Sequence, residues 1–404
     1  MRKRTLFLLC LLASPAAAQD STITLWTREV VNSAKLREQR SIYVTTPDGY
    51  RTGNNRYGVL VILDAEDRPQ FNLAVANVAF LASRGAIPGL IVVGIPNGKD
   101  RTHDLTPAAN GANAKNFPTA GGVAAFADFI VDEVVPLVRA KYRTMSTTIL
   151  AGHSFGGLVA LEVAAKKPGA FSGVIAMSPS LWWSDSSVVA YSDALAKAAK
   201  GQRVFVTSGG LEGDIDRPTV RFSRRLDSLK PPLTAFGHQR YPEDSHNMTP
   251  APSLVDGLRF IYEPVSVAKL PISMLGPDTD SAAAMNAFIE SRRRYAAGAR
   301  SLGLDERFPE SETNQFGYGA LQFLKKPAFA VWVFRQNVDV YPESANVYDS
   351  LGDGLLAMGD TTAAMAQFRR AVDVATRSRH PVLEDSRRKL KALEASQTAK
   401  PRGQ

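Results

Sequence analysis

Cysteine is nearly absent from this chain, since Cys10 is the single cysteine among 404 residues. Disulfide frameworks, thiolate zinc sites and a cysteine nucleophile at any later position are therefore excluded. Histidine is also scarce, with five in all, which leaves few candidates for a general base. Hydroxyl and carboxyl side chains are therefore the main remaining candidates for catalytic groups.

Long hydrophobic runs are missing as well. The apolar stretch Thr5 to Leu12 is too short to span a bilayer, and no later stretch is long enough. A basic start, Met1-Arg2-Lys3-Arg4, precedes it, and Ala16-Ala17-Ala18 follows it, which is the pattern of a cleavable signal peptide. We therefore expect a periplasmic or secreted protein without a transmembrane segment.

A nucleic-acid-binding pattern is not found either. The formal charge is +9, but the basic residues are dispersed, apart from the clusters Arg292-Arg293-Arg294 and Arg387-Arg388-Lys389. Neither cluster is interleaved with aromatic residues. The excess charge is interpreted as solvated surface charge, and no nucleic-acid partner is expected.

Alternating strand and helix patterns fill the chain from Ile23 to about Tyr262. The near-continuous apolar runs Tyr57 to Leu63 and Gly89 to Ile95 are typical of strands buried on both faces. Helix-forming segments separate the predicted strands, the longest being Val123 to Arg139. This alternation predicts an α/β fold with a mainly parallel sheet and helices on both faces.

The pattern becomes wholly helical after a segment with two prolines, Glu263 to Met274. Gly317 and Phe334, and about 34 residues later Gly352 and Phe368, occupy the small and large positions of a tetratricopeptide-like helical repeat. A generic helical hairpin is the alternative. Such repeats bind protein partners or support dimerisation. We expect the α/β part to be separable from them at the linker.

The predicted domains are as follows: residues 1–18, signal peptide; 19–263, α/β domain; 264–305, linker and helical segment; 306–395, tetratricopeptide-like domain; and 396–404, tail.

A nucleophile elbow is the strongest motif in the chain. The β-branched and apolar run before Gly152-His153-Ser154-Phe155-Gly156 predicts a strand, and the residues after it predict a helix. A serine on the sharp turn between strand and helix is exposed to substrate, and only glycine fits two residues to either side. Ser154 is therefore the candidate nucleophile, and the amide of Phe155 is a candidate oxyanion-hole donor.

His246 is the candidate base, because it lies after the last predicted strand, in the chain order serine, acid, histidine of α/β-hydrolases. His153 is adjacent to Ser154 in the elbow and is not expected to act as the base. The acid should follow the strand Arg203 to Thr207. Glu212, Asp214 and Asp216 compete there, and Glu212 is preferred, with Asp214 as the alternative.

The second oxyanion donor is expected in the loop that follows the strand ending at Leu63. That loop reads Asp64-Ala65-Glu66-Asp67, and the amide of Ala65 is the candidate. No metal or organic cofactor is required for this chemistry.

A family resemblance rests on several motifs together. They are Leu63-Asp64-Ala65-Glu66-Asp67; Pro96-Asn97 with Arg101 and Asp104-Leu105-Thr106-Pro107; the elbow; Ser178-Pro179-Ser180-Leu181-Trp182-Trp183; and Ser245-His246. The chain resembles the putative-esterase family over roughly Ile23 to Tyr262. The resemblance implies an α/β-hydrolase fold without a large lid and hydrolysis of carboxylic esters, as in siderophore esterases and S-formylglutathione-hydrolase-like enzymes. Ala65 departs from the glycine that is frequent there.

Three further residues are candidates for substrate binding. Arg101 is a candidate for steering an anionic substrate, with an ion pair to Asp104 as the alternative. Trp182 and Trp183 are candidates for lining the pocket, with packing of the loop onto the body as the alternative. The small-molecule substrate is expected to be an ester.

Two other functions remain open. One is acyl transfer to an envelope acceptor on the same fold. The other is a non-catalytic scaffolding protein whose helical repeats bind partners, although a complete serine, histidine and acid set argues against it.

Overall fold

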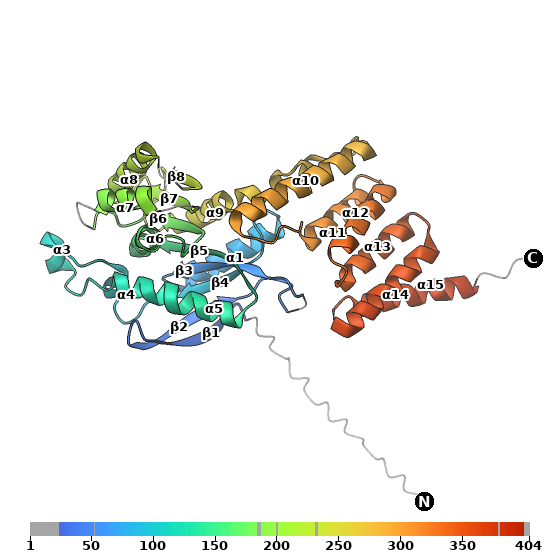
Figure 1. Ribbon diagram of the computed structural model, residues 1–404, viewed down its shortest axis with the longest axis horizontal. Helices are drawn as coiled ribbons and strands as arrows, with labels where there is room; N and C mark the ends of the chain where they lie inside the picture. Colours follow the sequence, from blue (N-terminus) through green and yellow to red (C-terminus); the bar gives the residue numbers. More distant parts are fainter. Residues whose placement is uncertain are drawn as a thin grey trace, which may run out of the picture.

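A computed structural model describes residues 24–51, 53–183, 187–198, 201–230, 233–378 and 380–399, and the predicted signal peptide lies outside these residues. An α/β part and a helical part lie side by side, with the long helix α10 (Ser281–Leu302) between them (Figure 1).

One eight-stranded sheet forms the centre of the α/β part. Its strands are β1 (Thr27–Ser33), β2 (Glu38–Thr45), β3 (Tyr57–Leu63), β4 (Leu90–Ile95), β5 (Thr144–His153), β6 (Gly173–Met177), β7 (Arg203–Gly209) and β8 (Ala235–Tyr241). Their order is β1-β2-β4-β3-β5-β6-β7-β8. Antiparallel pairing is confined to β1 with β2 and β2 with β4, and the other neighbours are parallel. The carboxyl ends of β3 to β8 therefore meet at one edge, and the predicted α/β-hydrolase fold is confirmed.

Helices cover both faces of this sheet. They are α1 (Arg68–Ser83), α2 (Arg101–Leu105), α3 (Gly111–Asn116), α4 (Val123–Asp128), α5 (Val135–Lys141), α6 (Phe155–Lys166), α7 (Ser187–Ala198), α8 (Asp216–Leu229) and α9 (Pro250–Ile261). Alternate strand residues face two separate cores, since Leu60 and Ile62 pack with α1 and α9, whereas Val59 and Val61 pack with α4 to α6. Burial on both faces explains the near-continuous apolar runs of the strands.

The helix expected over Val123 to Arg139 has a π-helical middle. Residues Phe129–Val134, between α4 and α5, form this π-helix, named η1. Pro136 follows closely and has no N–H to give to the carbonyl four residues earlier, so the hydrogen-bond register widens at this point.

The segment expected as a linker packs closely against both parts. It forms three short 3-10 helices, η2 (Glu263–Val265), η3 (Val267–Lys269) and η4 (Pro271–Met274). Val265, Val267, Leu270 and Ile272 are buried in the core cluster that also contains α1 and α9. The segment is therefore not a plain linker, because its apolar residues are buried in a core that they share with the sheet and with the helical part.

The C-terminal part consists of paired helices. They are α11 (Glu310–Gln322) with α12 (Pro327–Val340), α13 (Ala345–Ala357) with α14 (Thr361–Ser378), and α15 (Leu383–Ala399). A Cβ at Gly317 would lie 2.2 Å from the Phe334 ring, and one at Gly352 would lie 2.6 Å from the Phe368 ring. Glycine thus permits the close packing that the repeat pattern predicts, while α15 continues past the expected end at residue 395.

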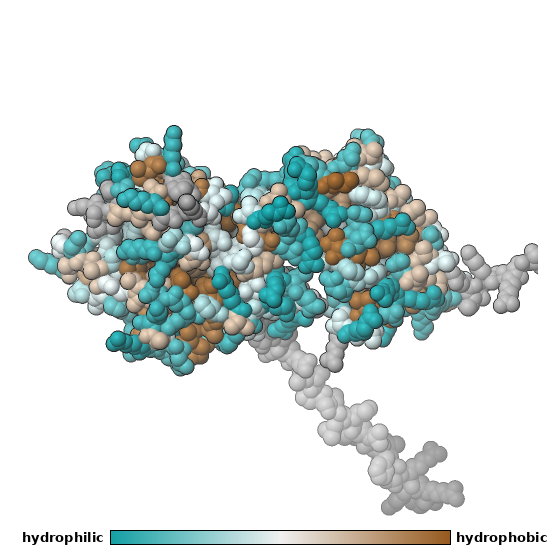
Figure 2. All heavy atoms as spheres, in the orientation of Figure 1, coloured by the Kyte–Doolittle hydropathy of each residue, from teal (hydrophilic) through white to brown (hydrophobic). Residues whose placement is uncertain are grey.

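The surface seen in Figure 2 has two lobes, on which hydrophilic residues surround small groups of apolar ones. Within the part of the chain that the structure describes, no helix is long and apolar enough to cross a membrane.

Candidate active site

The elbow has the strained geometry that its motif predicts. Ser154 lies between β5 and α6 with φ 59° and ψ −117°, a backbone conformation that is costly for a residue other than glycine. A Cβ at Gly152 would lie 2.2 Å from the carbonyl oxygen of Gly156. Only glycine therefore fits where the end of the strand passes so close to the start of the helix. The Ser154 amide donates to the carbonyl of Met177 at 3.0 Å, which fixes the turn on the neighbouring strand.

The hydroxyl of Ser154 has a second hydroxyl beside it. Its Oγ lies 3.2 Å from Oγ of Ser180, a residue that is almost fully buried. The Ser180 amide also donates to the carbonyl of Ser154 at 3.1 Å. Ser180 belongs to the motif Ser178 to Trp183, but the sequence assigned it no role, because serine in a loop carries little signal on its own.

Glu212 and His246 lie together where the sequence predicts an acid and a base. Nδ1 of His246 is 3.5 Å from Oε1 of Glu212, and the Glu212 side chain is completely buried. Amides of the β7 loop donate to carbonyls of the β8 loop, from Gly210 to Tyr241 at 2.7 Å and from Leu211 to Asp244 at 3.1 Å. These bonds fix the two loops to each other. The 3.5 Å separation is longer than a hydrogen bond, as is common in catalytic pairs without substrate.

The two competing carboxylates have other surroundings. Asp214 is exposed, and Asp216 pairs with Arg240 at 2.9 Å. Glu212 is therefore the one carboxylate of these three that lies beside His246.

Two buried hydroxyls join the acid loop to the histidine loop. Ser178, at φ 42°, donates from Oγ to Oε1 of Glu212 and lies 2.8 Å from Oγ1 of Thr249. Thr249 in turn donates to the carbonyl oxygen of His246 at 2.9 Å. The sequence assigned Ser178 no role beyond its motif, and it did not single out Thr249. The available signal was that a serine directly follows β6, next to the strand that precedes the acid.

The amide of Ala65 does not fit the oxyanion role predicted for it. Ala65 is fully buried, and its N–H donates to the carbonyl of Ile95 at 3.2 Å, which extends the pairing of β3 with β4. The Ala65 amide is therefore already engaged, because the strand pairing continues one position further than expected. Among the described residues nothing accepts from the amide of Glu66, the next along the chain, or from the Phe155 amide at the start of α6.

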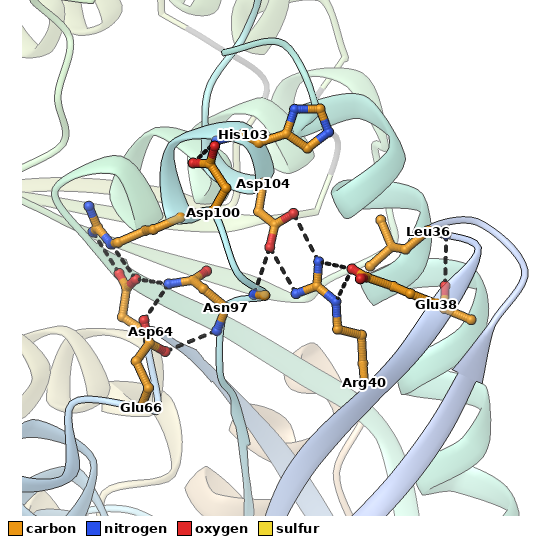
Figure 3. A network of polar contacts seen from close by, with 12 residues as sticks. Leu36, Glu38, Arg40, Asp64, Glu66, Asn97, Asp100, His103 and Asp104 are labelled. Atoms are coloured by element: carbon orange, nitrogen blue, oxygen red, sulfur yellow. Dashed lines mark hydrogen bonds and ion pairs between the residues drawn. The ribbon is translucent and has the colours of Figure 1, made fainter. Parts of the chain in front are cut away.

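Arg101 is bound to a different carboxylate from the one considered in the sequence. Its Nε and Nη2 donate to the two oxygens of Asp64 at 2.6 and 2.9 Å. Asn97 donates to Asp64 and Glu66 (Figure 3). Burial lowers the pKa of Arg101, but its hydrogen bonds with Asp64 outweigh burial, and the net pKa lies above its ordinary value. The Arg101–Asp104 alternative is wrong, because Asp104 is held by Arg40 at 2.8 Å.

The two tryptophans occupy different positions. Trp183 is 1% exposed, so its part in lining a pocket is not supported, and its ring packs edge-on against Phe155. Trp182 is partly buried and contacts both Phe117 and Phe155, with ring centroids 6.0 Å apart in each pair. These aromatic rings form a wall beside the elbow.

Metal-binding clusters of three or more histidine, cysteine or carboxylate residues do not occur among the described residues. The carboxyl edge of the sheet thus carries a serine on a strained turn and a histidine beside a buried carboxylate, and the amides of Glu66 and Phe155 have no acceptor among the described residues. This combination is suited to acyl transfer.

The fold and the elbow define an α/β-hydrolase, and comparison with known proteins gives the family. The family model described as putative esterase matches residues 33–226, and this part of the chain is similar to that family. The resemblance predicted from the motifs is thereby confirmed.

Named relatives and a solved structure agree with this assignment. A siderophore triacetylfusarinine C esterase of Aspergillus fumigatus is 35% identical over 134 residues, which are 30% of this chain and 42% of that protein. A ferri-bacillibactin esterase of Bacillus subtilis is 29% identical over 177 residues, which are 39% of this chain and 60% of that protein. The structure of an IroE-like serine hydrolase from Shewanella oneidensis has a TM-score of 0.62 and 25% identity, covering 77% of this chain and 99% of that chain. The matched segments thus span less than two thirds of these two curated relatives.

Proposed function

We propose that this protein is an exported serine esterase that hydrolyses small carboxylic esters. The observation that carries the proposal is the buried Glu212 carboxylate beside His246, at the same sheet edge as the strained Ser154 elbow. The export part rests on the predicted signal peptide at residues 1–18, which lies outside the described residues.

In the proposed mechanism His246 takes the proton of Ser154 as the hydroxyl attacks the ester carbonyl. Glu212 keeps the imidazole in one tautomer and stabilises its charged form, while Ser178 supplies a hydrogen bond to the carboxylate. His246 then protonates the leaving alcohol. Water attacks the acyl-enzyme with His246 as base, and Ser154 is regenerated.

The amides of Phe155 and Glu66 are the proposed oxyanion donors. The Phe155 amide begins α6, so the dipole of a twelve-residue helix adds to its donor strength. The carboxylate of Asp64, just before the Ala65-Glu66 turn, is fixed by Arg101 and Asn97, which would hold the second donor in place.

The substrate is proposed to be a small ester of the siderophore type, because the named relatives act on siderophores. Trp182 and Phe117 would contact an apolar or aromatic part of it. The helical hairpins are proposed to bind a protein partner or to support dimerisation, and no cofactor is needed.

The test is turnover and fluorophosphonate labelling of the full chain and of Ser154→Ala. We expect the variant to lose labelling and to lose turnover by on the order of 10⁴-fold, with an unchanged melting temperature. Ser180→Ala is the matched control and should still be labelled. Near-normal turnover by Ser154→Ala would sink the proposal. A panel from short acyl esters to ferric siderophore esters, with and without alcohol acceptors, separates hydrolysis from acyl transfer.

A further inference from the structure

His153 has no part in the proposed mechanism, although it is next to the nucleophile. It is 9% exposed, and its Nε2 lies 2.9 Å from the carbonyl oxygen of His246. A carbonyl oxygen can only accept, so this nitrogen carries the proton. Burial, and next the charge on His246, lower the pKa of His153 to about 3, so the ring is a neutral N–H donor at pH 7.

The carbonyl of His246 has a second donor of equal length. Thr249, which is fully buried, donates to it from Oγ1 at 2.9 Å. The two donors together satisfy both lone pairs of this oxygen. One donor comes from β5, the strand that carries Ser154, and the other directly precedes α9, so the backbone of the base is tied to two rigid elements.

The position of this backbone decides whether the acid and the base can pair. Nδ1 of His246 and Oε2 of Glu212 are both buried without a hydrogen-bond partner among the described residues. The 3.5 Å between Nδ1 and Oε1 is a few tenths of an ångström from a hydrogen bond. A small displacement of the His246 backbone would therefore make or lose the contact.

Packing of the two imidazole rings also helps to hold His246 in position. The rings of His153 and His246 have centroids 4.4 Å apart and an interplanar angle of 38°. His153 thus contacts the base at both its backbone and its imidazole.

We infer that His153 is a positioning residue, whose Nε2–H holds the carbonyl of His246 and thereby places the imidazole between Ser154 and Glu212. The inference rests on the proposed function and deepens it. Because His153 acts through His246 and not on the substrate, its removal should lower kcat and leave KM unchanged.

The test compares three variants of the full chain. His153→Gln places an amide N–H about where Nε2 lies, His153→Asn carries the same amide one methylene shorter, and His153→Leu has no donor. We expect the glutamine variant to keep kcat within about 3-fold of wild type and the other two to lose roughly 10- to 100-fold, with KM constant. Equal kcat in all three variants would overturn the inference.

Thr249 gives an independent arm, because it is distant in sequence from the nucleophile yet holds the same carbonyl. Thr249→Val should lower kcat and Thr249→Ser should not. The double variant His153→Leu/Thr249→Val should depart from the product of the single effects, since both residues act on one oxygen. A simple product would contradict the shared role.

Nuclear magnetic resonance of the imidazole nitrogens separates this inference from the proposed function. The ring signals of His246 should shift in His153→Leu and remain in place in His153→Gln, whether or not any ester is hydrolysed. Wild-type protein without esterase activity would refute the proposed function, whereas His246 signals indifferent to His153 would refute the positioning role.

Discussion

Three carboxylates follow β7 within five positions, and at the scale of single residues their surroundings decide what each can do. Glu212 is completely buried and faces an imidazole, Asp216 is neutralised by Arg240, and Asp214 is in solvent. A carboxylate can stabilise a transient imidazolium strongly where water is excluded and weakly where water screens it.

Glu212→Gln should therefore lower kcat by on the order of 10³- to 10⁴-fold, because a neutral amide cannot stabilise the charged imidazole. Asp214→Asn and Asp216→Asn are the matched controls and should change kcat less than about 3-fold. Steady-state turnover of a small ester measures all three. If Asp214→Asn lost turnover and Glu212→Gln remained active, the acid would be assigned to Asp214 in place of Glu212.

His153 also predicts a pH dependence of stability. Its pKa is about 3 in the folded protein and 6.5 as the ordinary value, so between these values the unfolded chain binds the extra proton and stability falls as the pH falls. From pH 7 to pH 5 this residue should account for about 2 kcal/mol of lost unfolding free energy. Urea unfolding of wild type and His153→Gln at both pH values checks it, and identical pH slopes would contradict it.

The sequence predicts residues that a motif or a chain order defines, but it does not show which backbone amides are already hydrogen-bonded. Ser154, His246 and Glu212 follow from an elbow and from the ends of apolar runs. Ala65 was misplaced, since nothing in its side chain shows that the pairing of β3 with β4 continues through its amide.

At the scale of elements, a buried ion pair fastens the loop after β4 to strand β2. Arg40 pairs with Asp104 (Figure 3), and the two side chains are 7% and 5% exposed. The amide of Gly98 also donates to Asp104 at 2.9 Å. This loop carries Asn97 and Arg101, which fix Asp64 next to the proposed oxyanion site. Sequence patterns placed the loop, but they could not show that Arg101 pairs with Asp64 while Asp104 pairs with Arg40.

Asp104→Asn should lower the unfolding free energy by about 3–5 kcal/mol, because the Arg40 guanidinium would be left buried with its charge uncompensated on that side. Glu38→Gln is the matched control: Glu38 binds the same guanidinium but is 45% exposed, and its loss should cost less than about 1 kcal/mol. Chemical denaturation measures both variants. Equal costs would show that burial of the pair is not what stabilises this loop.

At the scale of the whole molecule, the two parts share one hydrophobic core. The cluster that contains Leu60 and Ile62 of the sheet continues through α9, the 3-10 helices and α10 to Phe334 and Phe368 of the hairpins. Thr147 on β5 also donates to the carbonyl of Leu302 at the end of α10. Composition indicated a boundary near Glu263, but apolar contacts that join segments distant in sequence could not be read from it.

A chain ending at Tyr262 should consequently be unstable, contrary to the separability expected from the sequence. The cut removes Val265, Val267, Leu270 and Ile272, and each such buried side chain contributes about 1.5–3 kcal/mol. It also exposes Tyr262, which is fully buried in the whole chain.

We expect the fragment of residues 24–262 to aggregate or to melt at least about 10 °C below the full chain, with lower small-ester turnover. A chain ending at Ala395 is the control, because it keeps Ser386 and Lys389, which bind the buried Asp349 carboxylate, and it keeps Leu390 and Leu393, which pack on the shared core. Its melting temperature should stay within about 4 °C of the full chain. A soluble 24–262 fragment as stable and active as the full chain would show that the helical part is an independent appendage, despite the core that joins it to the sheet.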